Sequence, residues 1–155
     1  MIFVTLGTHE LKFTRLLDYL EEMDINEEVI IQAGNTKFES DKYKIVDFLS
    51  PKEFSEIMNK CDLIICHGGV GSILSALRLG KKVITVPRLS KYDEHNDDHQ
   101  IEICKKFHKK GYIINCVNYE ELENAINNYK NVIFTKYNFD NSQILNFILE
   151  YINNI

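Results

Sequence analysis

Short apolar runs along the chain alternate with segments in which apolar residues recur every three or four positions. A short apolar run that stops at a glycine, a proline or a polar residue is typical of a buried parallel strand. Such runs predict strands at residues 2–6, 28–33, 44–48, 63–66, 83–86 and 112–115. The recurring pattern predicts helices at residues 12–23, 51–61, 73–79, 98–110, 119–129 and 142–153.

One of these helices carries its own start signal. Ser50 is a favoured N-cap residue, Pro51 suits the first helical position, and Glu53 completes a capping box with Ser50. Strands and helices that alternate over short connections imply βαβ units, and therefore a mostly parallel sheet with helices on both faces. The sequence thus predicts a Rossmann-like α/β fold. Its 155 residues, 45% of them hydrophobic, fit a single domain over residues 1–155.

The charge balance is acidic, with a formal net charge of -5 and a pI near 5.5. Nucleic-acid binding needs clustered Lys and Arg, so no nucleic-acid partner is expected. No stretch approaches the ~20 apolar residues of a spanning helix, so we expect a cytoplasmic protein that reaches a membrane only through a partner. The cysteines lack metal-ligand spacing and are interpreted as reduced thiols, with a disulfide or zinc site as the less favoured alternative: Cys61, Cys66, Cys104 and Cys116.

The sharpest chemical signal is the segment LIICHGGVGSILSAL at residues 63–77, where an apolar strand breaks into a glycine-rich turn and then a helix. Glycines let the backbone approach an anion, and the free N–H groups of the helix start receive it. The alternative is a plain strand-to-helix turn. The segment lacks both the GxGxxG of a dinucleotide site and the GK[ST] of a P-loop. It therefore predicts a phosphate site of another kind.

Two further polar segments follow predicted strands, and the carboxyl ends of parallel strands share one edge of the sheet. The first is Gly7-Thr8-His9-Glu10, in which His9 is a candidate general base and Thr8 is alternatively a helix N-cap. The second is VPRLSKYDEHNDDHQ at residues 86–100, which suits recognition of sugar hydroxyls. Two other interpretations of this second segment stay open. It is either a metal site or an acidic loop that caps the next helix through Asp97 or Asp98.

Three segments taken together, VTLGTHELKFTRLL, ICHGGVGSILSAL and VPRLSKYDEHNDDHQ, resemble the C-terminal, donor-binding domain of glycosyltransferase family 28. The likeness extends to the small PssE-like subunits of bacterial exopolysaccharide and capsule synthesis, and to the donor subunit of the eukaryotic dolichol-linked GlcNAc transferase. The resemblance implies a GT-B half-domain that presents a UDP-hexose for inverting transfer to a lipid-linked acceptor. It also implies a membrane-anchored, PssD-like partner that binds the acceptor, and a reaction that needs no metal ion.

The same resemblance implies roles for individual residues. It assigns the backbone at Phe48 and Leu49 to the uracil ring, and Gln100 with His99 to the donor sugar. Several relatives carry an acidic residue for the ribose where this chain has Ser75, so ribose recognition departs from their pattern. The residues assigned to the diphosphate are Gly7, Thr8, His67, Gly68, Gly69, Gly71 and Ser72.

Two other functions remain open on the sequence: a non-catalytic nucleotide-sugar-binding or scaffolding subunit that enhances a catalytic partner, and a free-standing module that binds a phosphate ligand. The predicted closing helix carries an apolar stripe that Phe147 and Tyr151 widen. We expect this stripe to dock the partner, and the alternative is that it packs on the chain's own sheet.

Overall fold

The structure is a computed structural model that describes residues 1–139. Its strands are β1 (Ile2–Thr5), β2 (Val29–Gln32), β3 (Lys44–Val46), β4 (Leu63–Cys66), β5 (Lys82–Thr85) and β6 (Ile114–Asn115). Its α-helices are α1 (Thr14–Glu22), α2 (Pro51–Lys60), α3 (Val70–Arg78), α4 (His99–Lys109) and α5 (Tyr119–Asn128). Residues 1–139 also form two short 3₁₀ helices, η1 (Ser90–Tyr92) and η2 (Tyr129–Asn131).

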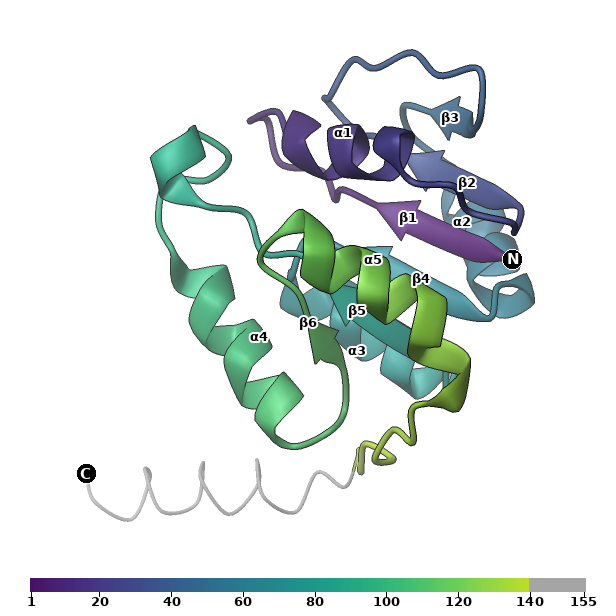
Figure 1. Ribbon diagram of the computed structural model, residues 1–155, viewed down its shortest axis with the longest axis vertical. Coiled ribbons are helices and arrows are strands. Elements are labelled where there is room, and N and C mark those ends of the chain that lie inside the picture. Colours follow the sequence, from purple (N-terminus) through teal and green to yellow (C-terminus); the bar gives the residue numbers. More distant parts are fainter. Residues whose placement is uncertain (140–155) are drawn as a thin grey trace.

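The strands form one sheet in the order β3-β2-β1-β4-β5-β6, and every neighbouring pair is parallel. From β1 the chain builds outward to β3 and then returns to place β4 on the other side of β1 (Figure 1). The strand order therefore reverses between β1 and β4. In open α/β sheets this switch point is where ligands bind, because the loops after the two strands part there in opposite directions.

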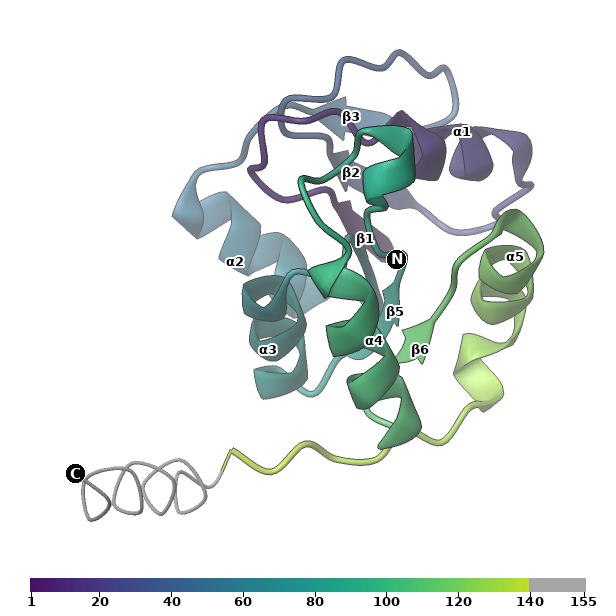
Figure 2. The ribbon, with the colours of Figure 1, turned by 90° about the vertical axis from the view of Figure 1, so that its left-hand side faces the viewer.

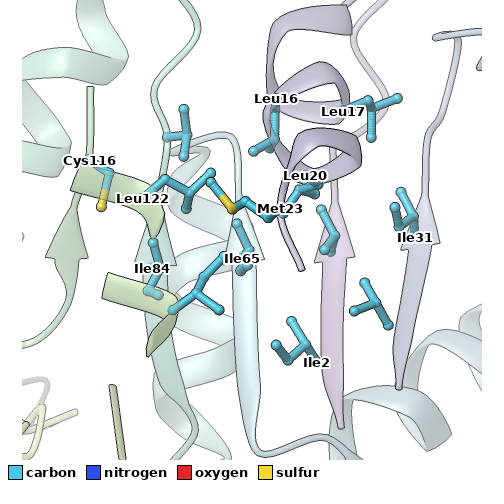
Figure 3. Packing of buried hydrophobic residues seen from close by; sticks show 14 of the residues in the cluster. Ile2, Leu16, Leu17, Leu20, Met23, Ile31, Ile65, Ile84, Cys116 and Leu122 are labelled. Carbon is cyan, nitrogen blue, oxygen red and sulfur yellow. The ribbon is translucent and has the colours of Figure 1, made fainter. Parts of the chain in front are cut away.

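Helices cover both faces of the sheet, as the sequence predicts. Helices α1 and α5 lie on one face and α2, α3 and α4 on the other (Figure 2). Figure 3 shows the core beneath α1, where Leu16 and Leu20 belong to the same apolar layer as Ile2 and Ile65 of the central strands. Successive strand residues point to opposite faces, so both faces of the four-residue strand β4 are fully buried. This two-sided burial is why its sequence is continuously apolar.

Most predicted elements match the structure to within a few residues, and the strand at 63–66 matches fully. The capping box is also confirmed, because Ser50 accepts a hydrogen bond from the Glu53 amide while the Glu53 carboxylate accepts one from Ser50 N. Helix α3 begins at Val70, three residues before the predicted start, and β6 is shorter than predicted. The predicted helix at 142–153, with Phe147 and Tyr151, lies outside the described residues.

All four cysteines are buried and unpaired, in agreement with their interpretation as reduced thiols. Burial in apolar surroundings raises the pKa of the Cys66 thiol to about 12, so this side chain stays neutral. Within residues 1–139 no helix combines the length and the apolar character needed to cross a bilayer.

Candidate functional site

A pocket of about 380 Å³ opens at the switch point, beyond the carboxyl ends of β1 and β4. It is lined by Thr5, Gly7, Thr8, Gln32, Phe54, His67, Gly69, Gly71, Ser72 and Ser75. None of these residues carries a carboxylate, although the chain as a whole has a net charge of -5. Although the protein is acidic, a negatively charged ligand that enters this pocket therefore meets no negative charge in the pocket lining.

The N-terminus of helix α3 opens into this pocket. Its N-cap residue, Gly69, supplies no side chain to cap the helix, and within residues 1–139 the amides of Val70, Gly71 and Ser72 have no hydrogen-bond partner. Free amides at a helix start point along the axis and carry the positive end of the helix dipole. Together with the Ser72 hydroxyl, they make this end of the pocket suited to a phosphate group.

Gly7 and Gly69 hold the imidazole of His67 between them. A Cβ atom on Gly7 would lie 2.5 Å from His67 Cε1, and a Cβ on Gly69 would lie 2.4 Å from His67 Nε2. Gly7 also has a φ of +75°, a conformation that other residues rarely adopt. Both glycines are thus required to seat the histidine ring, in addition to the backbone approach that the sequence suggested. A Cβ on Gly71, by contrast, would meet nothing within 4 Å.

The environment of His67 keeps its ring neutral. Burial, and to a lesser extent the nearby Arg88 guanidinium, lower the pKa of His67 to about 4. Its Nδ1 lies 3.4 Å from the carbonyl oxygen of Thr5. A neutral ring in the pocket can exchange hydrogen bonds with a ligand, but near neutral pH it does not supply a charge.

Gly68 has a different role from its neighbours, because it is buried behind the pocket and does not line it. Its φ is +87°, and a Cβ there would lie 2.6 Å from Cys104 Sγ on α4. This glycine lets α4 pack closely against the turn between β4 and α3. The sequence prediction that it contacts the diphosphate remains a prediction.

Arg88, which follows β5, connects two loops at the carboxyl edge of the sheet. The side chain is 1% exposed, and its Nη2 donates a hydrogen bond to Leu6 O at 2.9 Å. Its Nη1 donates to Leu11 O at 2.7 Å and to Glu94 O at 3.0 Å. Burial lowers its pKa to about 10, which still leaves the guanidinium charged at neutral pH. One buried cation therefore joins the β1–α1 loop to the β5–α4 loop.

A second contact between the same two loops is the ion pair of Arg15 and Glu94. Arg15 Nε and Nη2 each donate to the Glu94 carboxylate at 2.8 Å, and the amide of Leu89 donates to it at 2.9 Å. The side chains are 12% and 4% exposed. The Glu94 carboxylate is therefore engaged in holding the loops together. Beside this pair, a larger pocket of about 620 Å³ is lined by residues that include Glu10, Tyr19 and Tyr92.

The two sequence neighbours of His9 line different pockets: Thr8 lines the smaller pocket and Glu10 lines the larger one. Its ring stacks at a tilt against His95, with 4.7 Å between the centroids. Its Nδ1 accepts a hydrogen bond from the amide of Leu11 at 3.1 Å. Burial, then the nearby His95 and Arg88, lower the pKa of His9, so the ring is neutral at pH 7.

Other residues predicted from the sequence do not line the smaller pocket, although Leu49 contacts its wall. Phe48 is 53% exposed, and the amide of Leu49 donates to Gln32 Oε1 at 3.2 Å. Gln100 is buried and its Oε1 accepts from the Arg88 amide at 3.1 Å, while His99 is exposed at the start of α4. Of the predicted binding residues, the pocket brings together Gly7, Thr8, His67, Gly69, Gly71 and Ser72. The ligand contacts expected at all of these positions stay predictions.

The acidic residues of the β5–α4 loop serve the structure of the loop. Asp97 Oδ1 accepts from the His99 amide at 2.9 Å, and Asp98 Oδ1 accepts from the Ser90 amide at 2.9 Å. Asp98 is the N-cap residue of α4 but its side chain makes no capping hydrogen bond, whereas the Asp97 carboxylate, one residue earlier, accepts from the first amide of the helix. The alternative N-cap role of Thr8 is wrong, because α1 begins at Thr14 and Phe13 is its N-cap. Among the residues that the structure describes, no group of three or more His, Cys, Asp or Glu side chains is placed to hold a metal ion.

Three residues of the pocket were missed by the sequence reasoning: Thr5, Gln32 and Phe54. Thr5 and Gln32 are the last residues of β1 and β2, and a polar residue that ends an apolar strand is the signal that would have found them. Phe54 gave no such signal, because an apolar residue on a helix is expected to pack in the core. Its ring does contact the ring of Phe3 edge-on, with 5.3 Å between the centroids.

A parallel sheet of this order, with a pocket at its switch point, defines a Rossmann-like α/β domain. The sequence profile of the glycosyltransferase family 28 C-terminal domain matches residues 1–151, and the chain belongs to this family.

Solved structures share the fold of this chain, and a curated relative shares part of its sequence. The solution structure of ALG13 superposes with a TM-score of 0.62, at 24% identity, over 93% of this chain and 94% of that one. The crystal structure of Acinetobacter baumannii MurG superposes with a TM-score of 0.55, at 18% identity, over 82% of this chain and 40% of that one. The Candida albicans UDP-N-acetylglucosamine transferase subunit ALG13 is 34% identical over 100 residues. That match spans 63% of this chain and 32% of the relative's length.

Proposed function

We propose that this chain is the donor-binding subunit of a two-subunit inverting glycosyltransferase. It binds a UDP-hexose at the switch-point pocket and presents it to a lipid-linked acceptor that a membrane-anchored partner holds. The observation that carries the proposal is the uncapped N-terminus of α3, which opens into a pocket whose lining holds no carboxylate. Helix amides at that position stabilise the diphosphate in the bound donor and again as the leaving group.

The relatives suggest the donor with which to begin. The similar curated subunit belongs to a UDP-N-acetylglucosamine transferase, so UDP-N-acetylglucosamine is the first sugar nucleotide to test. The likeness to PssE-like subunits leads us to propose a role in exopolysaccharide or capsule assembly, at the cytoplasmic face of the membrane. In this scheme the helix amides, rather than a metal ion, offset the charge of the leaving diphosphate.

A non-catalytic subunit that only enhances its partner is the second candidate. The observation that favours it is that three carboxylates near the site already accept hydrogen bonds from backbone amides of the β5–α4 segment, those of Glu94, Asp97 and Asp98. A donor-binding subunit and a purely scaffolding enhancer differ in one measurable property: only the former must bind the sugar nucleotide by itself. A non-catalytic subunit that does bind the nucleotide is told apart by the activity of its variants with the partner.

Calorimetric titration of the purified chain with UDP and UDP-N-acetylglucosamine tests the proposed site. We expect Ser72→Ala to weaken binding by about 1 to 3 kcal/mol, because it removes one hydrogen bond to a charged phosphate. Gly71→Val is expected to weaken it further, since its side chain would enter the pocket without touching His67.

Ser55→Ala is the matched control, because Ser55 is exposed on α2 and does not line the pocket. Gly69→Val is the less informative variant, since the new side chain would displace the His67 ring as well as any ligand. Unchanged affinity in folded Gly71→Val and Ser72→Ala variants would reject this pocket as the nucleotide site.

A further inference from the structure

The hydrogen bonds around His9 determine which of its ring nitrogens carries the proton. Nδ1 accepts a hydrogen bond from the Leu11 amide at 3.1 Å. A ring nitrogen that accepts a hydrogen bond uses its lone pair and carries no proton. The neutral ring therefore holds its proton on Nε2. In this state Nε2 is a hydrogen-bond donor and has no lone pair with which to take up another proton.

His67, in the adjacent pocket, has the opposite arrangement. Its Nδ1 faces the carbonyl oxygen of Thr5 at 3.4 Å, and a carbonyl oxygen only accepts, so Nδ1 carries the proton. The Nε2 of His67 then bears the lone pair, and within residues 1–139 it has no hydrogen-bond partner. The two histidines thus have opposite tautomers, with an N–H group at Nε2 of His9 and a lone pair at Nε2 of His67.

The ring of His95 packs against the ring of His9 and restricts its orientation. The two rings lie 4.7 Å apart between centroids, with an angle of 36° between their planes. His95 is itself fixed by its own loop, since its Nδ1 lies 3.1 Å from Asp97 O and 3.3 Å from Asp97 N. The loop after β5 in this way orients a side chain that belongs to the loop after β1.

We propose that His9 acts as a neutral hydrogen-bond donor through Nε2, and that His95 is its positioning residue. This inference rests on the proposed function. In the transfer, a bond forms between the acceptor oxygen and the anomeric carbon, while the bond from that carbon to the diphosphate oxygen breaks. The electron pair of the broken bond stays on the diphosphate, whose growing negative charge the Nε2 proton of His9 stabilises. The proton of the acceptor hydroxyl goes to a base on the acceptor-binding partner.

A hydrogen-bond donor and a general base require opposite protonation states at Nε2 of His9. A general base must offer a lone pair to the acceptor hydroxyl. For His9 to do so through Nε2, the proton would have to move to Nδ1, and the hydrogen bond from the Leu11 amide would be lost. The donor role needs no such rearrangement.

Nitrogen NMR of the full chain, labelled with ¹⁵N-histidine, tests the assignment without any sugar nucleotide. We expect His9 to show a protonated Nε2 and a bare Nδ1, and His67 to show the reverse, with the signals assigned from His9→Gln and His67→Asn variants. A bare Nε2 on His9 at neutral pH would overturn the inference. Because no ligand is present, this result stands whether or not the chain binds UDP.

Activity of the chain reconstituted with its partner separates the two roles. The amide nitrogen of Gln lies near the position of a histidine Nε2 and donates, but it cannot act as a base. We therefore expect His9→Gln to retain activity within about tenfold of wild type, and His9→Ala to lose about 10² to 10³ in kcat. If His9→Gln is as inactive as His9→Ala, His9 is a base and the inference fails.

The positioning role of His95 predicts a rescue. His95→Phe keeps an aromatic ring against His9 and should retain kcat, whereas His95→Ala should lower kcat with little change in KM. His108→Gln, on α4, is the control for replacing a histidine elsewhere. Equal losses in His95→Phe and His95→Ala would contradict the stacking role. Calorimetry on each variant distinguishes these outcomes from a failure of UDP binding.

Discussion

At the residue scale, the glycines of the pocket serve two purposes that the sequence does not separate. Gly7 and Gly69 make room for the His67 ring, whereas Gly71 faces open space on the first turn of α3. A glycine-rich turn signals only that the backbone must be unhindered. Whether a ligand or a neighbouring side chain fills the space depends on contacts between loops that are far apart in the sequence.

The lowered pKa of His67 has a consequence for stability. In the folded chain this pKa is about 4, below the 6.5 of an unperturbed histidine. Between these values the unfolded chain binds the extra proton, so the free energy of unfolding falls as the pH drops from about 6.5 toward 4. We expect this group to contribute a loss of about 1 to 2 kcal/mol over that window, after allowance for partial exposure of the ring.

Urea denaturation of the wild type and of His67→Asn at several pH values measures this loss. Asn preserves a donor toward Thr5 O but does not titrate, so its stability should fall less steeply below pH 6.5. The carboxylates contribute equally to both proteins and cancel in the difference. Parallel stability curves would show that His67 is not buried in its neutral form.

At the element scale, the loops after β1 and β5 are joined by buried charge. Arg88 donates to Leu6 O and Leu11 O in the first loop and to Glu94 O in its own. The Arg15–Glu94 pair joins residues 79 positions apart. The sequence shows each loop as polar, but spacing along the chain does not reveal which charges meet. For this reason the second loop was assigned to sugar hydroxyls, although its most buried acidic side chain, that of Glu94, pairs with Arg15.

The ion pair makes a direct prediction for Glu94→Gln. Removing one partner leaves the Arg15 guanidinium, 12% exposed, without its counter-charge. We expect a loss of about 2 to 4 kcal/mol in the free energy of unfolding, in the range for broken buried pairs. Asp47→Asn is the matched control, because its pair with Lys37 is 55% and 77% exposed and should be worth less than about 1 kcal/mol.

Chemical denaturation measures the free energy of unfolding of the two variants and of the wild type. A loss in Glu94→Gln no larger than that in Asp47→Asn would mean that water enters between the loops and screens the pair. The double variant Arg15→Met/Glu94→Gln should be less destabilised than the sum of the two single variants, since no unpaired charge then remains buried.

At the scale of the whole molecule, much of the fold was predictable because its central strands are buried on both faces. The apolar runs at β1, β2 and β4 leave few other interpretations, and the glycines after them mark the ligand edge. The start of α3 was misplaced because Val70 and Gly71 are weak helix formers, so the pattern became regular only at Ile73. In the candidate site, residues that directly follow β1 and β4 were predicted, while Phe54 on α2 was not.

The division of labour between two subunits is the last prediction. The match to the family 28 C-terminal domain spans residues 1–151, and the proposed function assigns acceptor binding to a partner. We therefore expect the purified chain to bind UDP-N-acetylglucosamine but not to transfer the sugar until a membrane-anchored partner is added. The reconstituted activity should persist in EDTA, because helix amides rather than a cation stabilise the diphosphate. Transfer by the chain alone would refute the half-enzyme proposal, and activity that EDTA abolishes and Mg²⁺ restores would refute the metal-free mechanism.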